Sequence, residues 1–212
     1  MNIYPVENPM VGDDANFVLF RQTPETAMDA DEYSHFIYNI ESQFRKLRFY
    51  KDYKASLYNY GLNYDQQMKG INADMASIEM HHHLPTLKEA AIIIAEKNLR
   101  TKGYTNSFDV IAELVEAHRK NIMGVIMMSI TNHQLYHDNP TAFIPIEQLF
   151  GYPLLFLQDY YPYFTMDISY RWLLQFKMNE QYSGQVNWPN FTIARQQLMN
   201  WSSTPIGLNG VY

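Results

Sequence analysis

Apolar side chains recur every three or four positions over several stretches of the chain, which is the spacing of one face of an α-helix. In residues 31–60, Phe36, Ile40 and Phe44 belong to this pattern, which predicts one helix or a helix broken once. Helices are also predicted over residues 86–101, from 106 or 107 to 121, and over 131–138, 147–160, 166–181 and 193–201. The chain is therefore expected to be mostly helical.

Three short stretches have a different pattern and predict strands. Residues 75–81 are followed by Pro85, which cannot donate a hydrogen bond to a strand ladder and stops the strand. Residues 124–129 form a short apolar run, whose length favours a buried strand. Residues 16–20 could form a strand within residues 1–30, where turn signals otherwise indicate an irregular arm over the core.

Helix-end signals give the order of the central elements. Thr86 and Glu89 have the spacing of a capping box at the start of one predicted helix. Thr131 is a candidate N-cap for the short helix, which Asn139 and Pro140 end. The order is strand, two helices, strand and short helix, which predicts a mostly helical α+β fold.

The composition limits the possible cellular location, the possible metal ligands and the possible binding partners. The chain contains no cysteine, so a transition-metal site would need nitrogen and oxygen ligands, and a reducing compartment fits. The N-terminus has no secretory pattern and no apolar run approaches the roughly 18 residues of a membrane span, so we expect a cytoplasmic protein without membrane contact. The net charge of −6 counts against nucleic-acid binding unless positive charge is concentrated locally.

Histidines supply the strongest chemical signal. Five of the seven lie in two segments: His81, His82 and His83 are consecutive, and His133 and His137 have HxxxH spacing. On a helix, positions i and i+4 share one face, so two imidazoles can bind one cation. The sequence therefore predicts a metal site built from both segments.

A basic and aromatic stretch lies in residues 44–54, where five cationic side chains alternate with four rings. Such side chains can contact phosphates and stack on bases, or they can form a solvated helix face with its rings in the core. The candidates for DNA contact are Arg45, Lys46, Arg48, Lys51 and Lys54, together with Arg119 and Lys120 near the predicted site.

The two histidine segments resemble the HNH endonucleases, also called ββα-metal or His-Me finger nucleases. Residues 79–85 (EMHHHLP) look like the E-x-H-H-x-x-P opening of that family, and residues 127–137 look like its second strand and helix. The two helices between these halves are similar to those of HNH proteins of bacteriophages. The resemblance covers about residues 62–150, so we expect a 1–61 N-terminal arm and helical region, a 62–150 nuclease core, and a 151–212 aromatic-rich helical extension.

The resemblance implies a role for each histidine. With Pro85 as the anchor, His81 takes a metal-ligand role and His82 takes the role of general base. The HxxxH pair, His133 and His137, takes the remaining ligand roles. Because the run contains three histidines, the register is ambiguous by one residue, and His83 could be mistaken for the base.

The chain departs from the family pattern at its supporting residues. The central asparagine of the family aligns with Gly124, and Asn121 is the nearest asparagine that could serve. Glu79 of the motif is a further supporting residue. His118 is either a group that supports the site or a surface histidine at a helix C-terminus, where the helix dipole favours it. Zinc knuckles formed by cysteines are absent, so the inserted helices must brace the core.

The expected function is that of an endonuclease that hydrolyses DNA with one divalent cation. Three imidazoles favour Zn²⁺, Ni²⁺ or Mn²⁺, whereas Mg²⁺ prefers oxygen ligands. One alternative is a non-catalytic protein in which zinc stabilises the same fold, and another is a zinc hydrolase acting on something other than nucleic acid. The aromatic C-terminal region is the expected surface for a protein partner or a second copy. If the chain is encoded by a phage, its expected location is the host cytoplasm.

Overall fold

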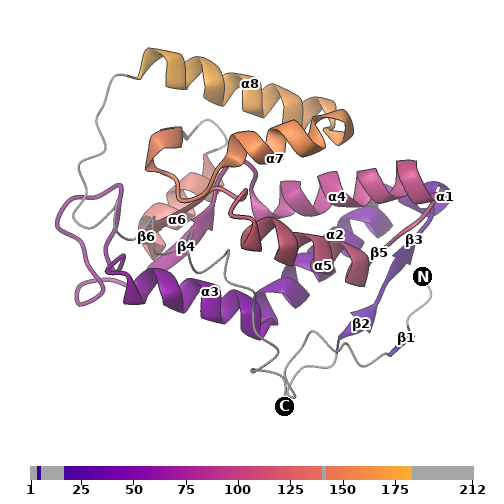
Figure 1. Ribbon diagram of the computed structural model, residues 1–212, viewed down its shortest axis with the longest axis horizontal. Coiled ribbons are helices and arrows are strands. Elements are labelled where there is room, and N and C mark those ends of the chain that lie inside the picture. Colours follow the sequence, from indigo (N-terminus) through magenta and orange to yellow (C-terminus); the bar gives the residue numbers. More distant parts are fainter. Residues whose placement is uncertain (1–3, 6–16, 140–141, 183–212) are drawn as a thin grey trace.

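The computed structural model describes residues 4–5, 17–139 and 142–182, and helices dominate this part of the chain (Figure 1). Its α-helices are α1 (Pro24–Ala27), α2 (Ala30–Lys46), α3 (Arg48–Asn59), α4 (Leu87–Lys102), α5 (Ser107–Arg119), α6 (Ile130–Asp138), α7 (Pro153–Tyr160) and α8 (Met166–Gln181). Its strands are β1 (Tyr4–Pro5), β2 (Val18–Leu19), β3 (Arg21–Gln22), β4 (Ile78–His82), β5 (Thr105–Asn106) and β6 (Val125–Ser129). Two 3-10 turns, η1 (Ile146–Gln148) and η2 (Tyr161–Tyr163), complete the described elements. The predicted class, mostly helical α+β, is confirmed.

The predicted break in the first long helix falls at Leu47, which separates α2 from α3. Leu47 has an extended conformation (φ −56°, ψ 140°) and its side chain is buried, so α3 starts in a new direction. Asp29 caps α2 because its carboxylate accepts hydrogen bonds from the backbone N–H groups of Asp31 and Glu32, both at 3.0 Å. The basic and aromatic stretch is therefore divided between two helices.

The strands form three separate antiparallel pairs: β1 with β2, β3 with β5, and β4 with β6. In the third pair Ile78 lies opposite Ser129 and His82 lies opposite Val125. Helix α6 follows β6 without a loop, and the hydroxyl of Ser129 accepts the N–H of Asn132 at 3.4 Å. The predicted N-cap at Thr131 is therefore wrong: Thr131 lies inside the helix because Ser129 already caps it.

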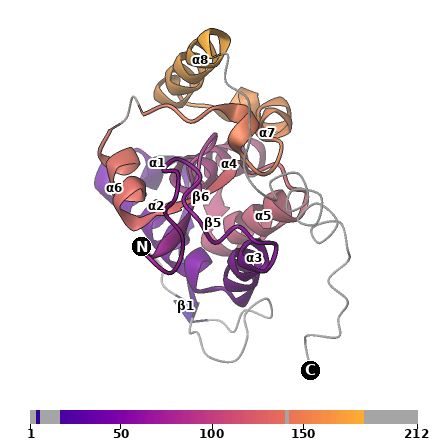
Figure 2. The ribbon, with the colours of Figure 1, turned by 90° about the vertical axis from the view of Figure 1, so that its left-hand side faces the viewer.

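One hydrophobic cluster joins most of the helices. It contains Phe36 of α2, Ile94 of α4, Ile111 of α5, Phe156 of α7 and Trp172 of α8, all of them buried. The cluster thus draws residues from each of the three ranges that the sequence suggested. Figures 1 and 2 both show α7 and α8 on one side of α4 and α5, with α3 on the opposite side.

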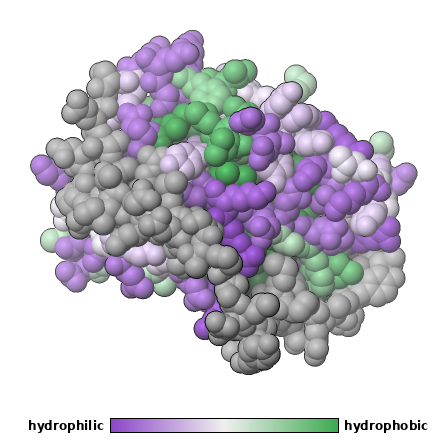
Figure 3. Space-filling view, viewed as in Figure 1, coloured by the Kyte–Doolittle hydropathy of each residue, from purple (hydrophilic) through white to green (hydrophobic). Residues whose placement is uncertain are grey.

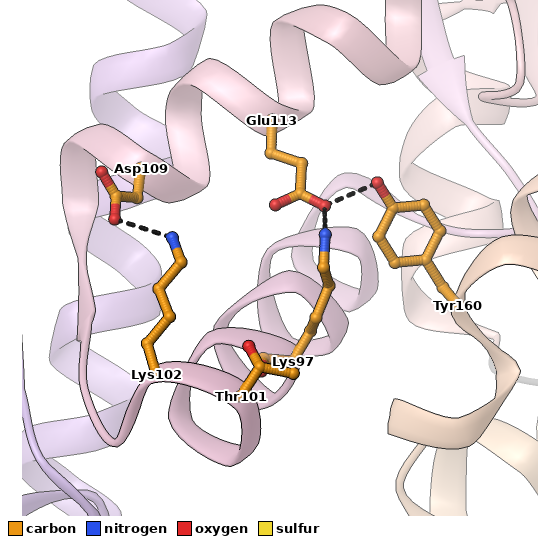
Figure 4. A network of polar contacts seen from close by, with 6 residues as sticks. All are labelled: Lys97, Thr101, Lys102, Asp109, Glu113 and Tyr160. Atoms are coloured by element: carbon orange, nitrogen blue, oxygen red, sulfur yellow. Dashed lines mark hydrogen bonds and ion pairs between the residues drawn. The ribbon is translucent and has the colours of Figure 1, made fainter.

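A polar contact fastens α7 to the central helices (Figure 4). The carboxylate of Glu113 on α5 pairs with the ammonium group of Lys97 on α4 and accepts the hydroxyl of Tyr160 at 2.7 Å. The Lys97 ammonium group also lies 5.2 Å from the centre of the Tyr160 ring. Burial and the Glu113 carboxylate raise the pKa of Tyr160, so its hydroxyl keeps the proton that it donates.

Apolar side chains are exposed on α7 and α8, including Leu154, Leu155, Met166 and Leu173. Figure 3 shows this green surface near the top of the view, where the two helices lie. It belongs to the region that the sequence suggested for partner binding, which stays a prediction. The helix predicted over residues 193–201 lies outside the described residues. No helix in the described part of the chain has the length and apolar character of a membrane span.

Candidate metal centre

Strand β4 presents consecutive histidines to different surroundings, because successive side chains of a strand point to opposite faces. The His81 ring lies 5.0 Å from that of His133 and 5.2 Å from that of His137, measured between ring centres. The His82 ring instead lies 5.1 Å from that of His118 and is stacked on Tyr50 at 6.1 Å. His81 therefore faces α6, whereas His82 faces α3 and α5.

Three imidazoles come together where the sequence predicted a cation site. His81, His133 and His137 each offer one ring nitrogen, and these nitrogens all lie within 4.8 Å of one another. The Nε2 atoms of His133 and His137 are 3.0 Å apart. Nitrogen ligands with metal bonds of about 2.0–2.1 Å in a tetrahedral site are separated by about 3.3 Å. The three nitrogens could therefore hold one metal ion, and the His133–His137 pair has nearly this spacing.

Glu79 orients one of these ligands. Its carboxylate lies 2.6 Å from Nδ1 of His133, so Nδ1 carries the proton that it donates and Nε2 keeps its lone pair. Histidines that bind metals commonly donate their second N–H to a carboxylate in this way, which fixes the tautomer and raises the basicity of the ligand. Glu79 thus contacts a candidate ligand, and its supporting role stays a prediction.

Burial keeps two of the candidate ligands, His81 and His133, neutral. Burial, together with the neighbouring His83, His133 and His137, lowers the pKa of His81 to about 2. Burial also lowers the pKa of His133, against the opposing effect of Glu79. A neutral imidazole has the free lone pair that a metal requires.

The loop before β4 holds α6 in place through Asp65, a buried residue. One carboxylate oxygen accepts the N–H groups of Gln67 and Met68 at 2.7 and 2.8 Å. The other accepts the N–H of Ser129 and the side-chain amide of Asn132, both at 2.8 Å. All these donors satisfy a buried charge, and they fix the start of the helix that carries His133 and His137. No local pattern indicated this role, because Asp65 lies in a polar linking segment.

The imidazoles open into a pocket with a volume of about 510 Å³. His82 lines the same pocket although it points away from His81. Four helices each contribute one cation to the lining: Arg45 of α2, Lys54 of α3, Lys88 of α4 and Arg171 of α8. Two carboxylates, those of Glu41 and Glu79, also line it. The lining is therefore net positive in a chain whose net charge is −6.

The structure divides the cations that the sequence proposed for DNA contact. Arg45 and Lys54 line the pocket, whereas Lys46, Arg48 and Lys51 are exposed elsewhere and do not. Lys120 is exposed away from the lining, and Arg119 pairs with Glu116 at 2.8 Å.

Two further cations of the pocket, Lys88 and Arg171, were not predicted from the sequence. Lys88 lies in the first turn of the helix after the histidine motif. Its closeness in sequence to the histidines could have predicted its place in the pocket. Arg171 lies far along the chain, and only the packing of α8 brings it to the pocket.

His118 is a buried residue, so the alternative of a surface histidine is wrong. Its Nε2 lies 2.9 Å from Nε2 of His82, and its Nδ1 lies 2.7 Å from the carbonyl oxygen of Leu114. The rings of Phe44 and Tyr53 cover it. His118 is buried although it lies near a helix C-terminus, because the last turn of α5 packs toward the core.

Gly124 and Asn121 lie beside the loop that follows β4. The carbonyl of Gly124 accepts the N–H of His83 at 2.9 Å, and a Cβ at Gly124 would lie 2.2 Å from the carbonyl oxygen of His83. The close approach of two backbones therefore excludes an asparagine at this position. Asn121 is buried with a left-handed backbone (φ 55°), and its side-chain amide forms no hydrogen bond within the described residues. Its backbone carbonyl accepts the N–H of Tyr152 at 2.8 Å.

His83, the residue that made the register ambiguous, does not line the pocket. Its ring nitrogen Nε2 lies 3.3 Å from the side-chain oxygen of Gln175 on α8. Burial lowers its pKa to about 4, and the contact with Gln175 opposes this effect. The environment of His83 is consistent with anchoring the motif on Pro85, which assigns the site roles to His81 and His82.

These elements define a mostly helical α+β protein with a histidine-rich site that could hold a metal ion. The family model of bacteriophage G278-like virion proteins matches residues 10–204. The chain therefore belongs to the bacteriophage G278-like virion protein family. No curated protein and no solved structure matches the chain.

The family assignment bears on two expectations from the sequence. The chain belongs to a family of virion proteins, and the expected location in the host cytoplasm stays a prediction. The comparisons give no support for the HNH resemblance, which rests on the histidine segments alone. The phage origin suggested by that resemblance agrees with the family that was found.

Proposed function

We propose that this virion protein is a metal-dependent phosphodiesterase that cuts DNA. The observation that carries the proposal is that three candidate metal ligands and a fourth histidine, His82, line one pocket. A hydrolytic site needs a place for a cation and a base beside the same substrate. The pocket volume of about 510 Å³ lies within the usual range for ligand sites.

The charge of the pocket favours a phosphate-containing substrate. Lys54 and Lys88 have no ion-pair partner among the described residues, while Arg45 is paired with Glu41 at 3.2 Å and Arg171 with Glu89 at 2.5 Å. The first turn of α4, with Thr86, Leu87 and Lys88, also lines the pocket. The helix dipole is positive at this end and attracts anions, and the capping box uses only the N–H groups of Thr86 and Glu89. DNA as the polymer rests on the resemblance of the histidine segments to HNH endonucleases.

The side chains divide the work of hydrolysis among themselves. His81, His133 and His137 would hold a divalent cation, which when bound stabilises negative charge on the scissile phosphate and the leaving oxygen. Glu79 keeps Nε2 of His133 free for that role. His82, neutral because burial lowers its pKa, takes the proton of the attacking water. Lys54 and Lys88 hold the neighbouring phosphates.

Plasmid nicking tests the proposal. The metal-stripped full chain would be incubated with supercoiled DNA and Mn²⁺, Mg²⁺, Zn²⁺ or Ni²⁺ in turn. We expect nicking with at least one ion, and at least 100-fold less with His82→Ala or His133→Ala, the scale of general-base and metal contributions. Lys46→Gln is the control, because Lys46 is exposed outside the pocket. A chain that binds the metal but cuts no DNA with any of the four ions would contradict the proposal.

A second candidate function is a non-catalytic virion component in which a metal stabilises the fold. One observation favours it: Nε2 of His82 already contacts His118, and His82 is only 6% exposed. In that case metal would raise the midpoint of thermal unfolding of the wild type and of His82→Ala equally, and no nicking would accompany it.

A further inference from the structure

The hydrogen bonds of His118 determine which nitrogen of His82 carries a proton. The carbonyl oxygen of Leu114 can only accept, so Nδ1 of His118, 2.7 Å away, must be the protonated nitrogen. Burial lowers the pKa of His118 to about 4, so at neutral pH its ring carries this single proton. Nε2 of His118 is then an acceptor with a free lone pair.

The tautomer of His118 in turn determines that of His82. Nε2 of His82 lies 2.9 Å from Nε2 of His118, and two unprotonated nitrogens at this distance would repel. His82 must therefore donate, so its proton sits on Nε2 and its lone pair sits on Nδ1. The hydrogen bonds of the described residues leave Nδ1 of His82 without a partner, and the side chain lines the pocket.

We propose that His118 is a positioning residue that holds His82 as the Nε2–H tautomer, so that Nδ1 is the atom that accepts the proton of the attacking water. The inference rests on the proposed function for this last step, whereas the tautomer follows from the hydrogen bonds of a neutral His118. The chain Leu114 carbonyl, His118 and His82 orients the base from the protein interior. The stacking of Tyr50 on His82, at an angle of 16° between ring planes, limits rotation of the ring.

This arrangement also accounts for the environment of His118. The rings of Phe44, Phe49 and Tyr53 surround His118, and contacts of this kind do not by themselves require an imidazole. An imidazole there provides one donor and one acceptor on opposite sides of the ring. Glutamine is the closest substitute, because its amide also carries one acceptor and at least one donor.

The tautomer can be read directly by NMR. The full chain labelled with ¹⁵N-histidine would be observed at pH 7, metal-free and with Zn²⁺, because protonated and unprotonated ring nitrogens have well-separated ¹⁵N shifts. The His82 signals would be assigned as those lost in His82→Gln. We expect a protonated Nε2 and an unprotonated Nδ1 for His82, and the reverse for His118. A His82 ring protonated at Nδ1, or at both nitrogens, would overturn the inference whether or not the chain cuts DNA.

Two substitutions test the positioning role in catalysis. His118→Gln retains an acceptor for His82, whereas His118→Leu retains only the packing. We expect kcat for nicking to fall less than 10-fold in the first and about 100-fold or more in the second, with little change in KM. Equal losses in both folded variants would overturn the positioning role. If the wild type cuts no DNA but His82 is the Nε2–H tautomer, the proposed function fails and the tautomer assignment stands.

Discussion

Glu79 and His133 are joined by a contact of 2.6 Å between a carboxylate oxygen and Nδ1, although 54 residues separate them in the chain. The contact crosses from β4 to α6, the two elements that carry the candidate ligands. It therefore links the orientation of one ligand to the strand that supplies another. The carboxylate has no need to touch the metal in order to affect its binding.

Replacing Glu79 by Gln should weaken metal binding without removing it. The substitution keeps the size of the side chain but removes the charge that raises the basicity of His133, and losses of about 10–100-fold in affinity are typical of such partners. Calorimetric titration of the metal-stripped protein with Zn²⁺ measures this. Glu41→Gln is the matched control, because Glu41 also lines the pocket but does not contact a ligand histidine. An unchanged affinity in Glu79→Gln would contradict the supporting role.

Metal binding should separate the ligands from the proposed base. His133→Ala removes a ligand and should lower the affinity for Zn²⁺ by at least 100-fold. His82→Ala should leave the affinity within a few-fold of the wild type, since His82 faces α3 and α5 rather than the three candidate ligands. The same calorimetric titration distinguishes the two variants. A loss in His82→Ala equal to that in His133→Ala would make His82 a ligand.

DNA binding should depend on cations of the pocket and not on those of the outer helix surface. Each phosphate contact to duplex DNA changes the slope of log K against log salt by about 0.9. Replacing Arg45, Lys54 and Lys88 together by Gln should flatten the slope by about two to three units. Arg171 is left in place because its removal would strand the buried carboxylate of Glu89.

The matched control replaces three cations outside the pocket, Lys46, Arg48 and Lys51, by Gln. This variant has the same change in net charge, so it reports any long-range electrostatic effect. Fluorescence anisotropy of a labelled duplex, measured with Ca²⁺ in place of the active ion, gives both slopes. A flatter slope in the outer variant alone would place the DNA on the exposed face of α2 and α3.

Acid should destabilise the metal-free protein partly through His118. Its pKa is lowered from the ordinary value of 6.5 to about 4 in the folded chain, so the unfolded chain binds this proton more readily. The stabilising contribution is present above pH 6.5 and is lost as the pH falls from 6.5 to about 4. The shift corresponds to at most about 3 kcal/mol. Between pH 7 and 4, the free energy of unfolding measured with urea should decrease less for His118→Gln than for the wild type. An identical decrease in both proteins would show that His118 does not cause the acid destabilisation.

Gly124 should tolerate no side chain. A Cβ there would lie 2.2 Å from the carbonyl oxygen of His83, and a backbone atom cannot move aside as a flexible side chain does. Gly124→Ala should therefore lower the free energy of unfolding by about 3 kcal/mol. Gly70→Ala is the control, since it has open space but a left-handed backbone (φ +88°), and it should cost about 1 kcal/mol. Urea denaturation measures both, and equal small losses would mean that the loop after β4 can move.

The sequence by itself determined the local structure and the identity of the candidate ligands. The Thr86 and Glu89 capping box and the 3.6-residue periodicity placed α4 and α5 because these signals act within a few residues. HxxxH spacing put His133 and His137 on one helix face for the same reason. The N-cap of α6 was predicted wrongly from local sequence. Here a strand leads directly into a helix, and Ser129 is both the last residue of β6 and the N-cap of α6.

Only the tertiary structure decided which groups surround those histidines. Local sequence cannot specify that α5 packs inward and buries His118 against His82, or that the linking segment returns Asp65 to the start of α6. Nor does it show that α8 carries Arg171 to the pocket while Lys46 on α2 points elsewhere. These placements depend on contacts between residues far apart in the chain, whose energies are set by the burial of whole helix faces. The sequence thus predicted the candidate ligand histidines, whereas the packing of the helices determined which residues contact and orient them.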